Sequence, residues 1–280
     1  MANLAKSDLQ AAAIRFTEEH QSNYLSEGVA LQPGLVGMRM YGAPLLGIAD
    51  AGDPLFAGLR ASQAIGPHFL LPETWLPGAR SVISFFSPLT EQVTEANLRD
   101  PADVPPEWLH ARIEGQLFIN ALTEHLRDLL VEAGAPSMIP LMDERFWSNG
   151  KPALSKEDGT VVPGFTSNWS ERHVAHVCGL GTFGLSRGLI TKKGMAGRFG
   201  SIITAMPLEP DGRPYTRYDE YCTHCGSCIA KCPVKAITLE TGKDQPACQH
   251  FCDEVLAKNA PRYGCGKCSV GVPCVRGIPS

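Results

Sequence analysis

Apolar residues recur at helical spacing in two segments, which predict helices over about residues 7–20 and 106–133. The first segment begins with the capping-box pattern Ser-Asp-Leu-Gln and keeps Leu9, Ala13 and Phe16 on one face. The second repeats leucine and isoleucine with the same period and stops before a glycine and a proline, which commonly follow a helix. It is the longest predicted helix.

Strand signals alternate with these helices. The continuous apolar and β-branched run at 81–86 predicts a buried strand, and residues 40–49 fit a strand or a loop leading into one. A short helix is expected over 170–178, followed by short strands near 189–191 and 201–206. Helices interspersed with isolated strands predict an α+β (α/β layered) fold.

The composition limits the class of protein. The chain has 280 residues, of which 44% are hydrophobic and 19% charged, which excludes a disordered polymer. The net charge is −4, with no strong basic excess, so a nucleic-acid partner is not expected. No apolar run approaches the ~20 residues of a membrane span, so no membrane association is expected. The N-terminal sequence lacks a signal-peptide pattern and a twin-arginine pair, which favours a cytoplasmic location.

Cysteine placement divides the chain. Nine of the ten cysteines lie in the last 59 residues, and Cys178 is the exception. Cytoplasmic thiols stay reduced, so clustered cysteines favour metal binding over disulfides. We therefore expect a first domain over residues 1–215 and a smaller ferredoxin-like domain over 216–280, with the polar, Gly/Pro-rich stretch 148–166 as an exposed loop in the first.

One cysteine motif specifies the metal group. Cys222, Cys225, Cys228 and Cys232 follow the spacing C-x2-C-x2-C-x3-C and precede Pro233, as in bacterial two-cluster ferredoxins. Three closely spaced thiolates can bind three corners of one 4Fe–4S cube, while the fourth serves the other cube. A zinc ribbon would show two separated C-x2-C pairs instead.

The remaining cysteines complete two cubes in a divergent second arm. We assign one cube to Cys222, Cys225, Cys228 and Cys274, and the other to Cys232, Cys248, Cys265 and Cys268. Cys252 is left over on an expected helix, where a buried packing role is favoured. Cys178 has the same interpretation, with a functional thiol as the alternative.

Two cubes imply that electrons pass one at a time from the first cube to the second, and such a relay needs an electron acceptor. The acceptor lies either in residues 1–215, which makes the chain an enzyme, or on a partner, which makes it an electron-transfer protein. No nucleotide-binding fingerprint is expected, because the G-x-G-x-x-G spacing at 179–184 follows a helix instead of a strand. The segment 173–208 has no acidic residue and four basic ones, which fits either an anionic group nearby or an exposed basic hairpin.

Other polar residues of this region allow alternatives. Glu171 and Arg172 are expected either to form an ion pair that fixes the loop or to be catalytic groups. His173 and His176 lie three positions apart on the short helix, but no third metal ligand is apparent nearby, which favours core or surface histidines.

The order of motifs resembles a known family. An ER-x5-CGLGTFG run, then LIT, FGSIIT, the cysteine motif and a final CGKC make residues 105–280 similar to cobalamin-dependent iron–sulfur reductases. These are the epoxyqueuosine reductases and, more distantly, the reductive dehalogenases. Phe165 occupies the position, about six residues before the Glu-Arg pair, where the resemblance predicts a proton-donating acid.

The resemblance implies a nitroreductase-like first domain that holds cobalamin beside the ferredoxin module. Electrons from a ferredoxin- or flavodoxin-type donor would pass through two 4Fe–4S clusters to cobalt, which would reduce a small-molecule or nucleoside substrate. Glu171 and Arg172 would be catalytic. The cofactor cavity would be lined by Ser167, Asn168, Trp169, Gly179, Gly181, Gly184, Thr191, Gly200 and Ser201.

Overall fold

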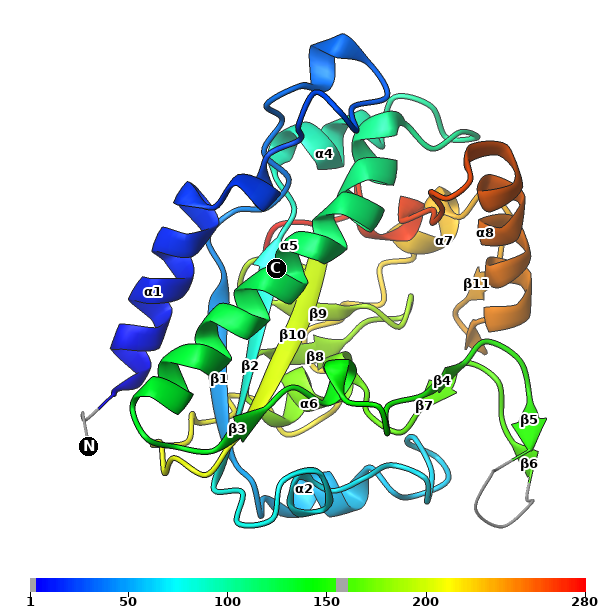
Figure 1. Ribbon diagram of the computed structural model, residues 1–280. Coiled ribbons are helices and arrows are strands. Elements are labelled where there is room, and N and C mark those ends of the chain that lie inside the picture. The colour runs from blue at the N-terminus through cyan, green and yellow to red at the C-terminus, as the bar shows by residue number, and fades with distance from the viewer. Residues whose placement is uncertain (1–3, 155–160) are drawn as a thin grey trace.

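The computed structural model describes residues 4–154 and 161–280. Its helices are α1 Lys6–Glu19, α2 Pro54–Gly58, α3 Pro72–Trp75, α4 Glu91–Ala96, α5 Pro106–Glu132, α6 Glu171–Val177, α7 Ser227–Lys231 and α8 Gln245–Asn259. Its strands are β1 Leu45–Asp50, β2 Ser81–Pro88, β3 Ser137–Met138, β4 Ser148–Asn149, β5 Ala153–Leu154, β6 Val161–Val162, β7 Thr166–Ser167, β8 Gly181–Phe183, β9 Leu189–Thr191, β10 Gly197–Thr204, β11 Ile237–Thr238 and β12 Gly242–Lys243. The predicted mixed α/β fold is confirmed (Figure 1).

A four-stranded antiparallel sheet in the order β1-β2-β10-β3 forms the centre of the first domain. In its longest pairing, β2 runs beside β10 from Pro88 opposite Gly197 to Ser81 opposite Thr204. Helices cover both faces, which explains the unbroken apolar run of β2 (Figure 1).

Side chains that alternate along the strands supply two separate cores. Ile83 and Phe85 of β2 pack with α1 and α5 on one face. Val82 of β2 and Ile203 of β10 pack with α6 on the other face, where Trp169 joins them. The second core brings the chain around α6 directly against the sheet.

The two predicted long helices are confirmed within a few residues. Two other expectations were less accurate. Strand β10 begins at Gly197, four residues before the predicted start at 201, because its pairing with β2 extends to Gly197 opposite Pro88. Glycine permits this close pairing, since a Cβ at 197 would lie 2.4 Å from the Phe86 ring. The stretch 148–166 contains β4 to β7 instead of a plain loop, although its residues 155–160 lie outside the described part.

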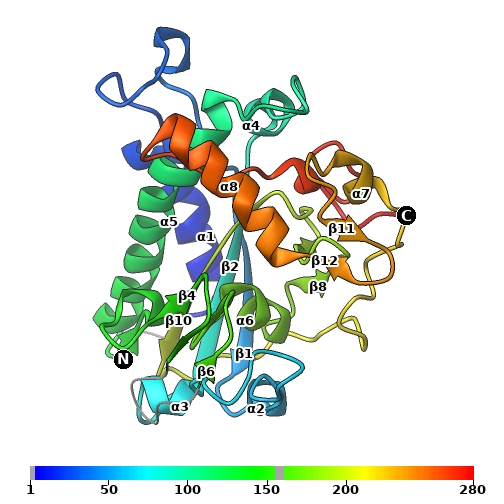
Figure 2. The ribbon, with the colours of Figure 1, turned by 90° about the vertical axis from the view of Figure 1, so that its right-hand side faces the viewer.

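The cysteine-rich segment packs against the first domain. Val255 of α8 contacts Val104 and Leu109 at the start of α5, and Figure 2 shows α8 crossing this end of the helix. The backbone N–H of Met195, before β10, donates to the Cys274 carbonyl at 3.0 Å. Among the described residues, no helix is long and apolar enough to cross a membrane.

Candidate iron–sulfur and redox site

Four cysteines surround a small cavity of about 20 Å³ between α7 and the C-terminal loop. They are Cys222, Cys225, Cys228 and Cys274, the set assigned from spacing to one cube. Gly226 takes a left-handed conformation with φ 74° at the N-cap of α7, which lets the loop turn sharply between Cys225 and Cys228. The cavity and its four cysteines are called the outer site below.

Five cysteines line a larger cavity of about 360 Å³ between α5, β10 and α8, called the inner site below. Cys232 lies at the end of α7, and Cys265 and Cys268 lie in the CGKC loop. Cys248 and Cys252 lie one turn apart on α8. The expected packing role of Cys252 thus gives way to a position on the cavity wall beside Cys248.

The two donor sets fit cubes. Within residues 4–154 and 161–280, no three His, Cys, Asp or Glu side chains converge on a point where a single metal ion could bind. A 4Fe–4S cube carries its four irons at alternate corners, and each binds one thiolate, so the thiolates surround a volume instead of a point. Four thiols at the outer site and five at the inner site supply the eight thiolates that two cubes need.

Burial and neighbouring groups shift the pKa values of the cysteine thiols. Burial raises the pKa of Cys228, Cys265 and Cys274 to about 11. The pKa of Cys248 is lowered to about 6, because Cys252 donates a hydrogen bond to its sulfur and the Lys243 ammonium lies beside it. Iron binds thiolates, so metal binding must displace protons from the buried thiols.

Cations gather at the inner site. Arg112 on α5, Arg172 on α6, Arg198 on β10 and Lys243 on β12 all line the cavity, and none of its described lining residues is acidic. Arg198 donates to the Gln116 side chain at 2.8 Å, while its Nε is buried without a partner among the described residues. The sequence flagged Arg198 within a basic stretch but missed Arg112 and Lys243, which only the tertiary fold brings to the cavity.

Lys267 adds a buried cation between two inner-site cysteines. Its side chain is 3% exposed, and its Nζ donates to the Asn97 carbonyl oxygen at 2.8 Å and to that of Asp100. The Asn97 amide in turn donates to the Cys265 carbonyl at 2.9 Å. The position of a lysine inside CGKC was a sequence signal for this role.

Glu171 belongs to a buried polar chain that links α6 to the sheet. Trp169 Nε1 donates to Ser201 Oγ at 2.9 Å, and Ser201 Oγ donates to Glu171 Oε1 at 2.9 Å. Glu171 Oε2 is buried and has no hydrogen-bond partner within the described residues. Burial raises the pKa of this carboxyl to about 7, although both hydrogen bonds act in the opposite direction.

Glu171 and Arg172 do not pair with each other. Arg172 extends to the inner site and donates to the Arg187 carbonyl at 2.6 Å, while Glu171 turns toward the sheet. The ion-pair alternative is therefore not what the structure contains. Arg172 is thus a cation at the inner site, whereas Glu171 is a buried acid in the core.

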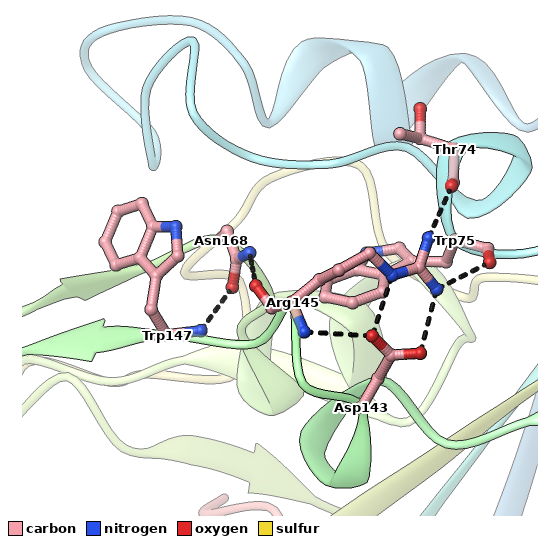
Figure 3. A network of polar contacts seen from close by, with 6 residues as sticks. All are labelled: Thr74, Trp75, Asp143, Arg145, Trp147 and Asn168. Carbon is pink, nitrogen blue, oxygen red and sulfur yellow. Dashed lines mark hydrogen bonds and ion pairs between the residues drawn. The ribbon is translucent and has the colours of Figure 1, made fainter. Parts of the chain in front are cut away.

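Polar residues predicted to line a cofactor cavity hold the first domain together. Figure 3 shows Asn168 donating to the Arg145 carbonyl and accepting from the Trp147 backbone N–H. Ser167 Oγ donates to the Trp169 carbonyl at 2.7 Å, and Thr191 Oγ1 to the Gly194 carbonyl at 2.8 Å. These contacts are internal to the chain.

The same network has a second centre in Arg145. Arg145 pairs with Asp143 at 2.7 Å and donates to the carbonyls of Thr74 and Trp75 (Figure 3). These contacts fasten α3 to the segment before β4.

Trp169 and the predicted glycines also make internal contacts. Trp169 is 1% exposed and stacks on Phe69 at 5.4 Å between ring centroids. A Cβ at Gly181 would lie 1.9 Å from the Ile190 carbonyl, and one at Gly200 would lie 2.5 Å from the Phe85 ring. Gly179 similarly approaches the Gly212 carbonyl. Of the predicted lining residues, Gly184 reaches the outer site, and the predicted catalytic residue Arg172 reaches the inner site. The predicted lining residues as a set therefore do not fit the lining of a corrinoid cavity.

The remaining candidates have packing roles. Cys178 is fully buried against the Val82 carbonyl. His176 Nδ1 bonds to the Gly181 carbonyl at 2.8 Å, and His173 Nδ1 to Ser170 Oγ at 2.8 Å. These ring nitrogens are thus occupied within the fold.

Comparison with known protein families gives a match in the segment that contains most of the outer-site cysteines. A family model described as a 4Fe-4S binding domain matches residues 215–238. This stretch is a 4Fe–4S binding region. It contains the first four cysteines of the segment, from Cys222 to Cys232, and ends before α8. Among curated proteins, none matches the chain.

Several solved structures show partial similarity. A selenomethionine-labelled epoxyqueuosine reductase is 19% identical, with a TM-score of 0.49 over 84% of this chain and 65% of that chain. Epoxyqueuosine reductase from Bacillus subtilis is 20% identical, with a TM-score of 0.47 over 84% of this chain and 62% of that chain. A catabolic reductive dehalogenase is 15% identical, with a TM-score of 0.49 over 84% of this chain and 30% of that chain. This chain thus spans less than two thirds of the length of these proteins.

Proposed function

We propose that the chain is an iron–sulfur oxidoreductase in which two 4Fe–4S clusters pass electrons to a centre in residues 1–215. The observation that supports it is the division of the nine C-terminal cysteines between the outer and inner sites. Cys222, Cys225, Cys228 and Cys274 bind the outer cube. Cys232, Cys248, Cys265 and Cys268 bind the inner cube.

The electron path follows the order of the two sites. Cys228 and Cys232 lie at opposite ends of α7, four residues apart, which corresponds to about 6 Å along a helix. Cys225 is exposed at the outer site, where a low-potential donor of the ferredoxin or flavodoxin class can approach. The inner-site cavity lies against α5 and β10, so a cube bound there would be the one that serves the first domain.

In this proposal the electron acceptor lies in the first domain. The sequence resemblance names cobalamin, which would supply a strongly reducing cobalt when bound. The predicted lining residues make internal contacts instead, so no step of the proposal passes through that group. The proposed reaction is the reduction of a small-molecule substrate in the first domain with electrons from the inner cube.

Glu171, which is buried against the sheet one residue before the inner-site Arg172, is proposed as a proton donor in the first domain. Reductions commonly take up a proton with the electrons, and a carboxyl with a pKa near 7 holds one at neutral pH. The proton would reside on the buried Oε2, because Oε1 accepts from Ser201. Phe165, where the resemblance predicts an acid, cannot serve this purpose.

Anaerobic purification with metal analysis tests the proposal. About eight irons per chain and a brown chromophore that dithionite bleaches are expected for two cubes. Corrinoid titration of the same preparation then separates the functions. A cobalamin spectrum that changes on binding supports the enzyme, whereas iron without corrinoid affinity supports an electron-transfer protein, and zinc or no metal contradicts both.

A further inference from the structure

The two cysteine sites differ sharply in charge. Arg112, Arg172, Arg198 and Lys243 line the inner site, and Lys267 is buried between Cys265 and Cys268. None of these five cations is paired with a carboxylate within the described part of the chain. Their positive charge is therefore available to whatever occupies the cavity.

One lysine ammonium, that of Lys243, lies directly against an inner-site sulfur, and a second, that of Lys267, is held nearby by the Asn97 and Asp100 carbonyls. The Lys243 ammonium is within hydrogen-bonding range of Cys248 and also acts on Cys268. Lys267 lies beside Cys265, to which its backbone N–H donates. A cation held this close to a thiolate, away from bulk water, is weakly screened.

The outer site has no comparable charge. No lysine or arginine occurs among its described lining residues, and its His224 pairs with the Asp219 carboxylate at 3.3 Å. Arg217 is likewise paired with Asp219. The pKa values of the Cys228 and Cys274 thiols are raised chiefly by burial, with a further contribution from neighbouring cysteines.

We propose that these cations, with Lys243 foremost, give the inner cube the higher reduction potential and so fix the direction of electron flow. The inference rests on the two cubes of the proposed function. Reduction adds one negative charge to a cube that is already anionic, and nearby positive charge stabilises the reduced form. In each transfer the outer cube is oxidised by one electron and the inner cube is reduced by one. No bond or proton changes place, and a low-potential one-electron donor re-reduces the outer cube.

Solvent acts in the opposite direction but more weakly. Water near the exposed Cys225 also stabilises a reduced cube, which raises the potential of the outer site. Mobile water dipoles also screen charge, whereas Lys243 is a full charge fixed against sulfur and Lys267 is a second one held by backbone carbonyls beside Cys265. The inner cube is therefore the easier one to reduce.

Potentiometric titration of the anaerobically purified full chain, followed by electron paramagnetic resonance, tests the inference. Two reduction waves are expected in the wild type. In Lys243→Gln the wave at higher potential should move to lower potential, while the other wave stays in place. Lys243→Arg should restore the wild-type position, and Lys258→Gln on the exposed side of α8 should change neither wave.

A single wave, unmoved waves, or a shift confined to the lower wave would overturn the inference. Iron content separates this failure from that of the proposed function. About eight irons with unmoved waves contradict the charge argument alone, whereas a chain without two cubes contradicts the function itself. If Lys243→Gln loses iron, Arg172→Gln provides the same measurement with an exposed side chain at the inner site, and an unmoved upper wave there contradicts the inference.

Discussion

Lys267 and Asn97 fasten two distant segments to each other. The lysine Nζ donates to the Asn97 carbonyl, and the asparagine amide donates to the carbonyl of Cys265. The loop after α4 thereby holds the CGKC cysteines against the first domain. The geometry of the inner site depends on this contact as well as on the cysteines themselves.

Replacing this lysine should loosen the loop. Lys267→Met keeps the length of the side chain but leaves the Asn97 and Asp100 carbonyls without their donor, at a cost of roughly 1–3 kcal/mol for each buried group. We expect a lower midpoint of anaerobic thermal unfolding. Lys258→Met, at an exposed position on α8, is the control and should leave the midpoint unchanged.

The two cysteines of α8 should differ in iron binding. Cys248→Ser removes a ligand of the inner cube, so about half the iron should be lost, whereas Cys252→Ser should keep all of it. The variants change one atom at positions one helical turn apart, which makes each the control for the other. Iron and sulfide analysis gives the result, and a loss of iron in Cys252→Ser would instead make that thiol the ligand.

Glu171 should make stability depend on pH. Its folded pKa of about 7 lies above the ordinary glutamate value of 4.5, so its contribution is full below pH 4.5 and is lost as pH rises through 7. The difference corresponds to about 3 kcal/mol. Glu171→Gln should therefore gain in stability relative to the wild type between these pH values. Denaturant unfolding of both proteins at a series of pH values measures this gain, and parallel curves would contradict the raised pKa.

Gly200 should tolerate no side chain. In Gly200→Ala the new Cβ would lie 2.5 Å from the Phe85 ring and 2.8 Å from Thr123 Oγ1, so α5 must move away from the sheet. Overpacking of this kind costs about 1–3 kcal/mol. Gly28→Ala meets no atom within 4 Å and should unfold like the wild type in the same denaturant titration.

Local patterns in the sequence predicted a large part of the fold. The periodicity of α1 and α5 and the apolar run of β2 gave these elements, and cysteine spacing alone grouped Cys274 with the first three cysteines and Cys232 with the later ones, as the two cavities do. The 4Fe–4S region was identified from the same spacing.

Features that depend on tertiary contacts could not be predicted from the sequence. Gly181 and Gly200 were expected to face a cofactor, but they permit close approach of the chain to itself. Arg112 reaches the inner site from the middle of an ordinary amphipathic helix, where nothing distinguishes it from a surface arginine. The start of β10 was missed because glycine carries no strand signal.

The exposure of Cys225 has a practical consequence for anyone handling the protein in air. Oxygen reaches a cube through the ligand that faces solvent, and Cys225 is exposed while the inner-site cysteines, Cys268 among them, are half-buried. Bleaching should proceed in two stages, the first quick and the second slow. A briefly oxidised sample would then be a half-loaded species that has lost its entry point for electrons yet still looks brown.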